Sequence, residues 1–164
     1  MPKNILIINF SKKLDSCLID LFENINTRGY KLRFLIKHKN FEQILKEKSW
    51  PYSKTHCPIG ENNNITFFFF PLFLLLGLIV FAPKLIFKKL KHKIGTIICF
   101  GWQEKIIFTP IAKLLKIKII WLEIPGLENF ALYKPLNWLY RFNARLIKII
   151  IFSSLILLKL LKII

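Results

Sequence analysis

Residues 93–126, KIGTIICFGWQEKIIFTPIAKLLKIKIIWLEIPG, contain the clearest indication of the fold class of this chain. Residues 96–100 (TIICF) and 118–122 (KIIWL) are short apolar runs, typical of strands buried on both faces of a sheet. The sequence between them has a helical pattern. We expect this helix to begin near Glu104, or near Thr109 with Pro110 at its first position. Two strands joined by a helix are parallel, so the stretch predicts a strand–helix–strand unit.

The same order of elements occurs at the start of the chain. Residues 4–10 (NILIINF) predict another buried strand. Apolar residues at helical spacing follow over residues 14–25, with Ser11 as a plausible N-cap and Gly29 after the helix. Residues 30–36 alternate between apolar and basic side chains, which predicts a half-exposed strand. The first 37 residues therefore form a second strand–helix–strand unit.

The remaining elements extend this pattern along a single domain of residues 1–164. Asn40 and Gln43 resemble a capping box before a short helix that ends at Lys48, and residues 49–64 are expected to be mostly loop. The other expected elements are a Pro125–Gly126 turn, a helix over 135–146, a strand over 147–152 and a helix over 154–164. The repeated order predicts an α/β fold with a doubly wound parallel sheet.

Residues 65–83 (ITFFFFPLFLLLGLIVFAP) contain no charge, and five lysines follow by residue 93. Such a run is compatible with a transmembrane span, a helical element in the membrane interface, or a buried core helix. A span would place strands of one sheet on opposite sides of a membrane, and Pro71 and Gly77 disfavour a straight span. We expect the segment 65–93 to be a membrane-associating insertion at the interface. The expected membrane-binding residues are Phe68, Phe69, Leu74, Lys84, Lys88 and Lys89.

The composition restricts the class of protein. Apolar residues make up 54% of the 164 residues, which excludes a disordered tail, and the net charge is +17. Residues 62–164 hold 15 basic and 3 acidic side chains. A strongly basic chain favours an anionic membrane surface or a nucleic acid, although frequent Lys, Ile, Phe and Asn also indicate an AT-rich genome. Without a nucleic-acid-binding motif, we expect the membrane surface and no nucleic acid.

Several catalytic and cofactor motifs are absent from the sequence. There is no G-x-G-x-x-G after the first strand, no P-loop motif and no G-x-S-x-G. The three cysteines form no C-x-x-C, which fits a reducing compartment, and the three histidines are widely spaced. We therefore predict neither a cofactor nor a metal site.

Ligands of parallel sheets bind beyond the carboxyl ends of the strands, where two of the chain's nine acids are expected. Glu104 and Glu123 are candidate catalytic residues, each as a base or as a hydrogen-bond acceptor for a sugar hydroxyl. Alternatively, Glu104 stabilises a helix dipole and Glu123 forms a salt bridge. Trp102 is equally compatible with stacking on a sugar and with the core, whereas Trp121 is expected in the core. The candidate acceptor-binding residues are Asn9, Ser11, Trp102, Gln103 and Gly126.

The order of elements resembles the N-terminal, acceptor-side half of GT-B glycosyltransferases of the family 4-like group. The resemblance covers nearly the whole chain and rests on KNILIINF (3–10), on residues 93–126, and on LNWLYRFNARLIKIIIFSS (136–154). In that family a histidine often follows the fifth strand, where this chain has Glu123. The resemblance implies binding of a lipid-linked or saccharide acceptor in cell-envelope polysaccharide or glycolipid synthesis.

The family binds its nucleotide-sugar through a C-terminal domain with a Glu-x7-Glu pattern, and this chain has no such spacing. The resemblance therefore implies that the donor-binding domain is absent and that the chain is a truncated product, one subunit of a split transferase or a degenerate copy. If it is a split subunit, the nucleotide-sugar binds only through a separate donor-binding chain. We expect no turnover by this chain alone. The expected location is the cytoplasmic face of the cell membrane. The alternative function is a small basic non-enzymatic membrane protein spanning the bilayer at 65–83.

Overall fold

The protein is described from a computed structural model of the 164-residue chain. The structure describes residues 4–10, 16–55, 70–123, 134–147 and 150–152. The predictions for Ser11, the Pro125–Gly126 turn and the helix over 154–164 lie outside these residues.

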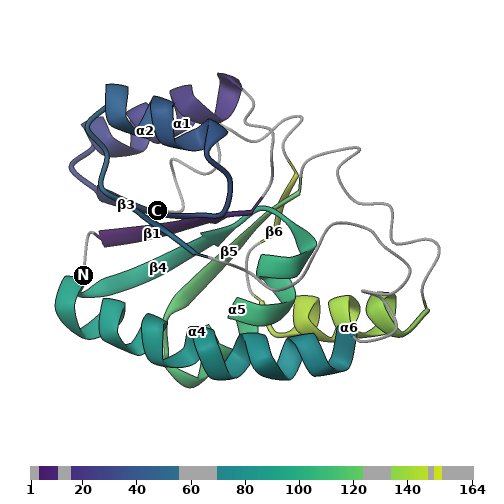
Figure 1. Ribbon diagram of the computed structural model, residues 1–164. Coiled ribbons are helices and arrows are strands. Elements are labelled where there is room, and N and C mark those ends of the chain that lie inside the picture. The colour runs from purple at the N-terminus through teal and green to yellow at the C-terminus, as the bar shows by residue number, and fades with distance from the viewer. Residues whose placement is uncertain (1–3, 11–15, 56–69, 124–133, 148–149, 153–164) are drawn as a thin grey trace.

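A six-stranded sheet in the order β3-β2-β1-β4-β5-β6 forms the centre of the molecule (Figure 1). Its strands are β1 (Asn4–Asn9), β2 (Lys31–Ile36), β3 (Tyr52–Lys54), β4 (Ile94–Cys99), β5 (Lys118–Glu123) and β6 (Ile150–Phe152). Every neighbouring pair is parallel. The chain builds β1, β2 and β3 outward in one direction and then returns to β4 beside β1. The prediction of a doubly wound parallel sheet is therefore confirmed.

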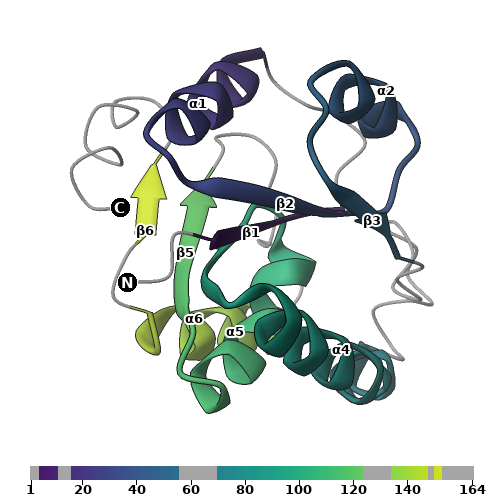
Figure 2. The ribbon, with the colours of Figure 1, turned by 90° about the vertical axis from the view of Figure 1, so that its left-hand side faces the viewer.

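Helices cover both faces of the sheet. Figure 2 shows α1 (Ser16–Thr27) and α2 (Asn40–Glu47) on one face, and α4 (Phe70–His92), α5 (Trp102–Leu114) and α6 (Lys134–Arg145) on the other. We call these the α1/α2 layer and the α4–α6 layer. Each layer has its own core, because alternate side chains of a strand point to opposite faces. In β1, Ile5 and Ile7 pack toward the α1/α2 layer, whereas Leu6 and Ile8 pack toward the α4–α6 layer.

Aromatic side chains are central to both cores. Phe22, Phe34 and Trp50 pack together in the α1/α2 layer, with ring centroids 5.3–6.2 Å apart. Phe81 and Phe108 are 5.1 Å apart in the α4–α6 layer. Such aromatic pairs contribute specific packing geometry in addition to apolar burial.

Helix α4 contains the described part of the predicted apolar run. One side packs against the sheet and α5: Phe81 and Leu85 are fully buried, and a Cβ on Gly77 would lie 3.4 Å from Ile107. The opposite side carries a row of large apolar side chains in water. We call this the α4 row: Leu72, Leu75, Leu76, Ile79, Val80, Ile86, Phe87 and Leu90. In the part of the chain that the structure describes, no helix is long and apolar enough to cross a membrane.

The structure corrects several predicted elements. Residues 52–54, expected in a loop, form edge strand β3, which is too short to show a period in sequence and exists through pairing with β2. The predicted capping box at Asn40 is wrong, because Lys39 is the N-cap and makes no side-chain capping bond. Of the two predicted starts of α5, the one near Glu104 is confirmed, because the helix begins at Trp102; the start near Thr109 is wrong, because Pro110 lies in the helix interior. Its buried apolar face compensates for the hydrogen bond that this proline cannot donate.

Candidate functional site at the carboxyl edge of the sheet

Three neighbouring strands, β1, β4 and β5, end side by side at one edge of the sheet. Asn9 is buried at the end of β1, Gly101 connects β4 to α5, and Glu123 ends β5. This arrangement exists because β4 pairs with β1 on one side and with β5 on the other. The first turn of α5 therefore lies between the ends of β1 and β5.

Glu104, in the first turn of α5, reaches toward β1. Its Oε1 accepts a hydrogen bond from the backbone N–H of Phe10 at 2.5 Å, and the residue is only 1% exposed. The carboxylate also lies against Gly101, since an added Cβ there would be 2.2 Å from Glu104 Oε2. The absence of a Cβ at Gly101 therefore leaves room for the Glu104 carboxylate, which would have to shift if a Cβ were added.

Lys105, the next residue, reaches in the opposite direction toward β5. Its Nζ lies 2.9 Å from Glu123 Oε2, and the lysine is completely buried. The hydroxyl of Tyr140 in α6 donates a hydrogen bond to the other oxygen of Glu123. The lysine Nζ also lies 5.8 Å and 5.9 Å from the ring centroids of Trp121 and Tyr140. Pairing and hydrogen bonding of this kind are what permit charges to be buried.

Two more hydrogen bonds hold Trp121 and Thr109 in place beside the Lys105–Glu123 ion pair. Trp121 Nε1 donates to Thr109 Oγ1 at 3.1 Å, and Thr109 Oγ1 donates to the backbone carbonyl of Lys105 at 2.5 Å. Trp121 is fully buried, as predicted. Two consecutive residues, Glu104 and Lys105, thus attach the start of α5 to the strands on both sides of β4.

The structure brings the predicted carboxylates to one edge of the sheet but gives them different partners. Glu123 does form a salt bridge, one of the two alternatives, and Glu104 lies in a helix's first turn. Trp102 and Gln103 are half-buried in that same turn, and Trp102 packs against the core. Ser11 and Gly126 lie outside the described residues. The catalytic and acceptor-binding roles stay predictions.

Sequence reasoning missed Lys105 and the role of Tyr140 in this cluster. Lysine is almost never fully buried unless it is paired, and its partner Glu123 lies 18 positions further along the chain. The sequence does show two adjacent charged residues, Glu104 and Lys105, directly before an apolar helical face. That signal cannot identify which strand each charge contacts.

The described residues hold no group of three or more His, Cys, Asp or Glu side chains that would bind a metal ion. Cys99 is a free, buried thiol behind the site. Burial raises the pKa of Cys99, and the negative charge of Glu104 adds to this effect.

The structure also places the predicted membrane-binding residues of α4. Lys84 is exposed, whereas Leu74 is half-buried and packs against the core. Lys88 Nζ donates to Ser53 Oγ at 2.7 Å, and Lys89 Nζ donates to the carbonyl of Leu115 at 2.5 Å. Burial lowers the pKa of Lys88, and the positive charges of neighbouring basic residues lower it further. Phe68 and Phe69 lie outside the described residues.

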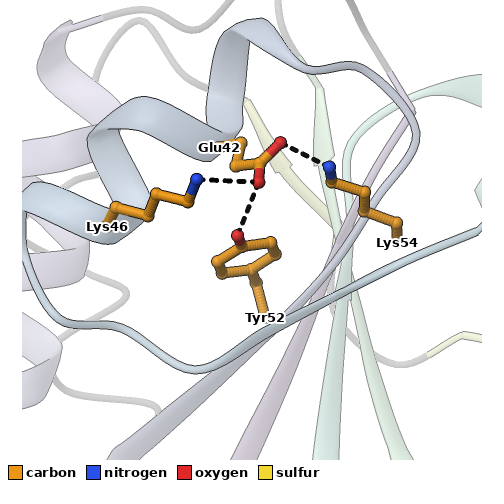
Figure 3. A network of polar contacts seen from close by, with 4 residues as sticks. All are labelled: Glu42, Lys46, Tyr52 and Lys54. Carbon is orange, nitrogen blue, oxygen red and sulfur yellow. Dashed lines mark hydrogen bonds and ion pairs between the residues drawn. The ribbon is translucent and has the colours of Figure 1, made fainter.

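A second polar network joins α2 to edge strand β3 (Figure 3). Glu42 contacts Lys46 at 3.1 Å, Lys54 at 2.5 Å and the Tyr52 hydroxyl at 2.7 Å. Hydrogen bonds from Lys54, Tyr52 and Lys46 lower the pKa of Glu42 to about 2. These partners are partly exposed, and the network attaches β3 to α2 without forming a buried site.

Comparison with known proteins relates the whole fold to solved structures. MurG from Acinetobacter baumannii superimposes with a TM-score of 0.61 and 13% identity, over 93% of this chain and 42% of that one. UDP-GlcNAc 2-epimerase from Methanocaldococcus jannaschii gives a TM-score of 0.60 and 14% identity, over 94% and 40% of the two chains. The chain has a GT-B glycosyltransferase-like fold. The predicted resemblance is thereby confirmed at the level of the GT-B fold.

A third structure with this GT-B-like fold is CalG4, the calicheamicin glycosyltransferase, with a TM-score of 0.55, 10% identity and coverage of 86% and 35%. The chain thus spans about two-fifths of the length of these three proteins. No protein-family model matches the sequence, and no curated protein matches it. Because these identities are low and an epimerase is among the three, the comparisons define the fold and leave the reaction to be argued from the site.

Proposed function

We propose that the chain is the acceptor-binding half of a membrane-associated glycosyltransferase of cell-envelope polysaccharide or glycolipid synthesis. A GT-B-like fold that spans 42% of MurG supports the assignment to one half of such an enzyme. In this proposal the nucleotide-sugar binds to a donor-binding domain, in the same or in a separate chain, and residues 1–164 have no turnover alone. The acceptor is a lipid-linked or other saccharide.

The α4 row is the observation that carries the membrane part of this proposal. Its side chains are strongly exposed, with Ile79 at 69% and Leu90 at 74%. From Leu72 to Leu90 the row is about 27 Å long, since a helix rises about 1.5 Å per residue. A contiguous apolar surface of this kind is unusual on a protein that contacts only water.

The charges around the α4 row favour an anionic bilayer as its partner. Lys84, Lys91 and Lys93 are exposed at the C-terminal half of α4 and directly after it. Each lysine near an anionic leaflet contributes about 1 kcal/mol to binding, and this leaflet faces the cytoplasm. We therefore propose a peripheral location on the cytoplasmic face of the cell membrane, with α4 lying in the interface.

Glu123 is the carboxylate best placed to contact an acceptor. It is 15% exposed at the end of β5, whereas Lys105 behind it is fully buried. Lys105 and Tyr140 each contact one oxygen, and an ionised carboxylate accepts about four hydrogen bonds in total. Acceptor capacity is therefore left on the carboxylate, and we propose that Glu123 accepts a hydrogen bond from a sugar hydroxyl. Trp102 and Gln103 would contact the same sugar.

Vesicle co-sedimentation tests the membrane assignment. The wild-type chain should sediment with vesicles containing anionic lipid and only weakly with neutral vesicles. Ile79→Glu combined with Phe87→Glu should abolish sedimentation. Asn24→Glu combined with Asn26→Glu, on exposed positions of α1, makes the same charge change as a matched control and should retain sedimentation. Equal sedimentation of both double variants would contradict the proposal.

A transfer assay tests the enzymatic part. The purified chain is incubated with radiolabelled nucleotide-sugars and membrane lipids, alone and together with a donor-binding GT-B chain from the same source. Transfer should require both chains and should fall at least tenfold with Glu123→Gln. Transfer by the present chain alone would contradict its assignment as an acceptor-binding half.

A further inference from the structure

The turning point of the sheet lies between β1 and β4, where the strand order reverses. In doubly wound folds this is the crevice in which ligands bind. The backbone N–H groups directly after β1 and at the start of the helix that follows β4 flank this crevice, and both carry partial positive charge that favours an anion. In this chain the corresponding groups belong to Phe10 and to the start of α5.

A carboxylate of the chain itself occupies this position. Glu104 extends back from the first turn of α5, and its Oε1 accepts the Phe10 N–H at 2.5 Å. The carboxylate also fills the space above Gly101, where a Cβ would meet Oε2 at 2.2 Å. At 1% exposure the charge is withdrawn from water. Two backbone segments 94 residues apart are thus joined by one internal anion.

We infer that Glu104 is a built-in anion that closes this crevice to the diphosphate of a nucleotide-sugar. The inference rests on the proposed function and specifies the ligand that the acceptor half admits. A phosphate entering beside a buried carboxylate would be repelled strongly, because Coulomb energies grow as the local dielectric constant falls. A neutral saccharide hydroxyl meets no such repulsion. The edge of the sheet thereby selects uncharged acceptor groups over the charged donor.

Truncation of the whole Glu104 side chain, which removes both the charge and the atoms that fill the space, should convert the crevice into an anion site. Glu104→Ala should unfold at a lower temperature than wild type in chloride, and inorganic phosphate at about ten times its Kd should raise that midpoint by roughly 4 °C. Phosphate should leave wild type unchanged relative to chloride at equal ionic strength. Glu104→Gln, which still fills the space, should also show no phosphate response. Glu47→Ala, which removes an exposed carboxylate from α2, is the matched control.

A measurement on the wild-type chain keeps the inference testable if Glu104→Ala does not fold. Phosphate and UDP are titrated into the labelled protein while the amide resonances of Phe10 and Gly101 are followed. Unchanged resonances are expected. Saturable shifts of these two amides, or a folded Glu104→Ala variant without a phosphate response, would overturn the inference. Neither readout depends on vesicle binding or sugar transfer, so failure here is distinguishable from failure of the proposed function.

Discussion

The two helical layers of this protein bury similar cores but present different outer surfaces. All eleven exposed large apolar side chains of the described residues lie in the α4–α6 layer, and none lies in the α1/α2 layer. Eight form the α4 row, and the others are Leu114, Trp138 and Phe142. The comparison shows that packing against the sheet requires only one apolar side of a helix. The second apolar side of α4 contacts no other element in the described part of the chain, which is the reason for our proposal that it contacts a membrane.

The ion pairs of the two layers differ in how deeply they are buried. The α4–α6 layer contains the fully buried Lys105 and its partner Glu123, whereas the α1/α2 layer has the partly exposed contacts of Glu42 with Lys46 and Lys54. Buried charges are retained only with close partners, whereas exposed pairs contribute little. The α4–α6 layer therefore has both the apolar outer surface and the buried ion pair of the candidate site.

The largest expected effect compares the two sides of α4. Phe81→Ala, on the buried side, should lower the free energy of unfolding by about 3–5 kcal/mol. Ile79→Ala, on the exposed side, should change it by less than about 0.5 kcal/mol. Urea unfolding without lipid measures both. Similar losses for the two variants would mean that the α4 row is covered in the free protein.

The second prediction compares ion pairs of the two layers. Lys105→Met should lower the free energy of unfolding by about 3 kcal/mol, because it leaves Glu123 without its buried partner. Lys54→Met should have little effect, because Lys54 is about half exposed and Glu42 retains Lys46 and Tyr52. Adding Glu123→Gln to Lys105→Met should recover part of the loss. No recovery in this double variant would indicate that Lys105 acts through packing alone.

The third prediction compares a glycine from each layer. Gly101→Ala should lower the free energy of unfolding by about 1–3 kcal/mol, because its Cβ overlaps the Glu104 carboxylate. Gly29→Ala in the α1–β2 connection should lower it by about 1 kcal/mol, because Gly29 has a φ of 85°. Adding Glu104→Ser should relieve the first substitution and leave the second unchanged. Relief of both, or of neither, in thermal unfolding would refute this distinction.

The smallest expected effect is on the stability of the protein at acidic pH. The pKa of Glu42 is about 2 in the folded chain against an ordinary value of 4.5, so its contribution to stability is present above pH 4.5 and is lost as the pH falls toward 2. Wild type should therefore be more stable than Glu42→Gln at pH 6, and the difference should shrink between pH 4.5 and pH 3. A difference that grows on acidification, measured by urea unfolding at each pH, would have the wrong sign.

The sequence was sufficient for the fold class because its signals are local. The continuous apolar run over residues 96–100 and the helical spacing over residues 14–25 are each visible in a short stretch of sequence. The alternation of such strands and helices along the chain implies parallel strands. The position of Glu104 and Glu123 at one sheet edge followed from the same order. Strand β3 escaped prediction because three residues carry no period, and Pro110 indicated a helix start that the buried face of α5 overrides.

The order of elements, the sheet edge of the candidate site and the unusual apolarity of residues 65–83 can thus all be inferred from the amino-acid sequence alone. Which side of α4 faces water depends on packing, because the charge-free residues 70–83 have no periodic pattern that would orient the helix. Packing likewise buries Lys105 against Glu123 and brings Glu104 to the Phe10 N–H. These contacts join residues from separate elements, and the pairing of β4 with β1 and β5 brings those elements together.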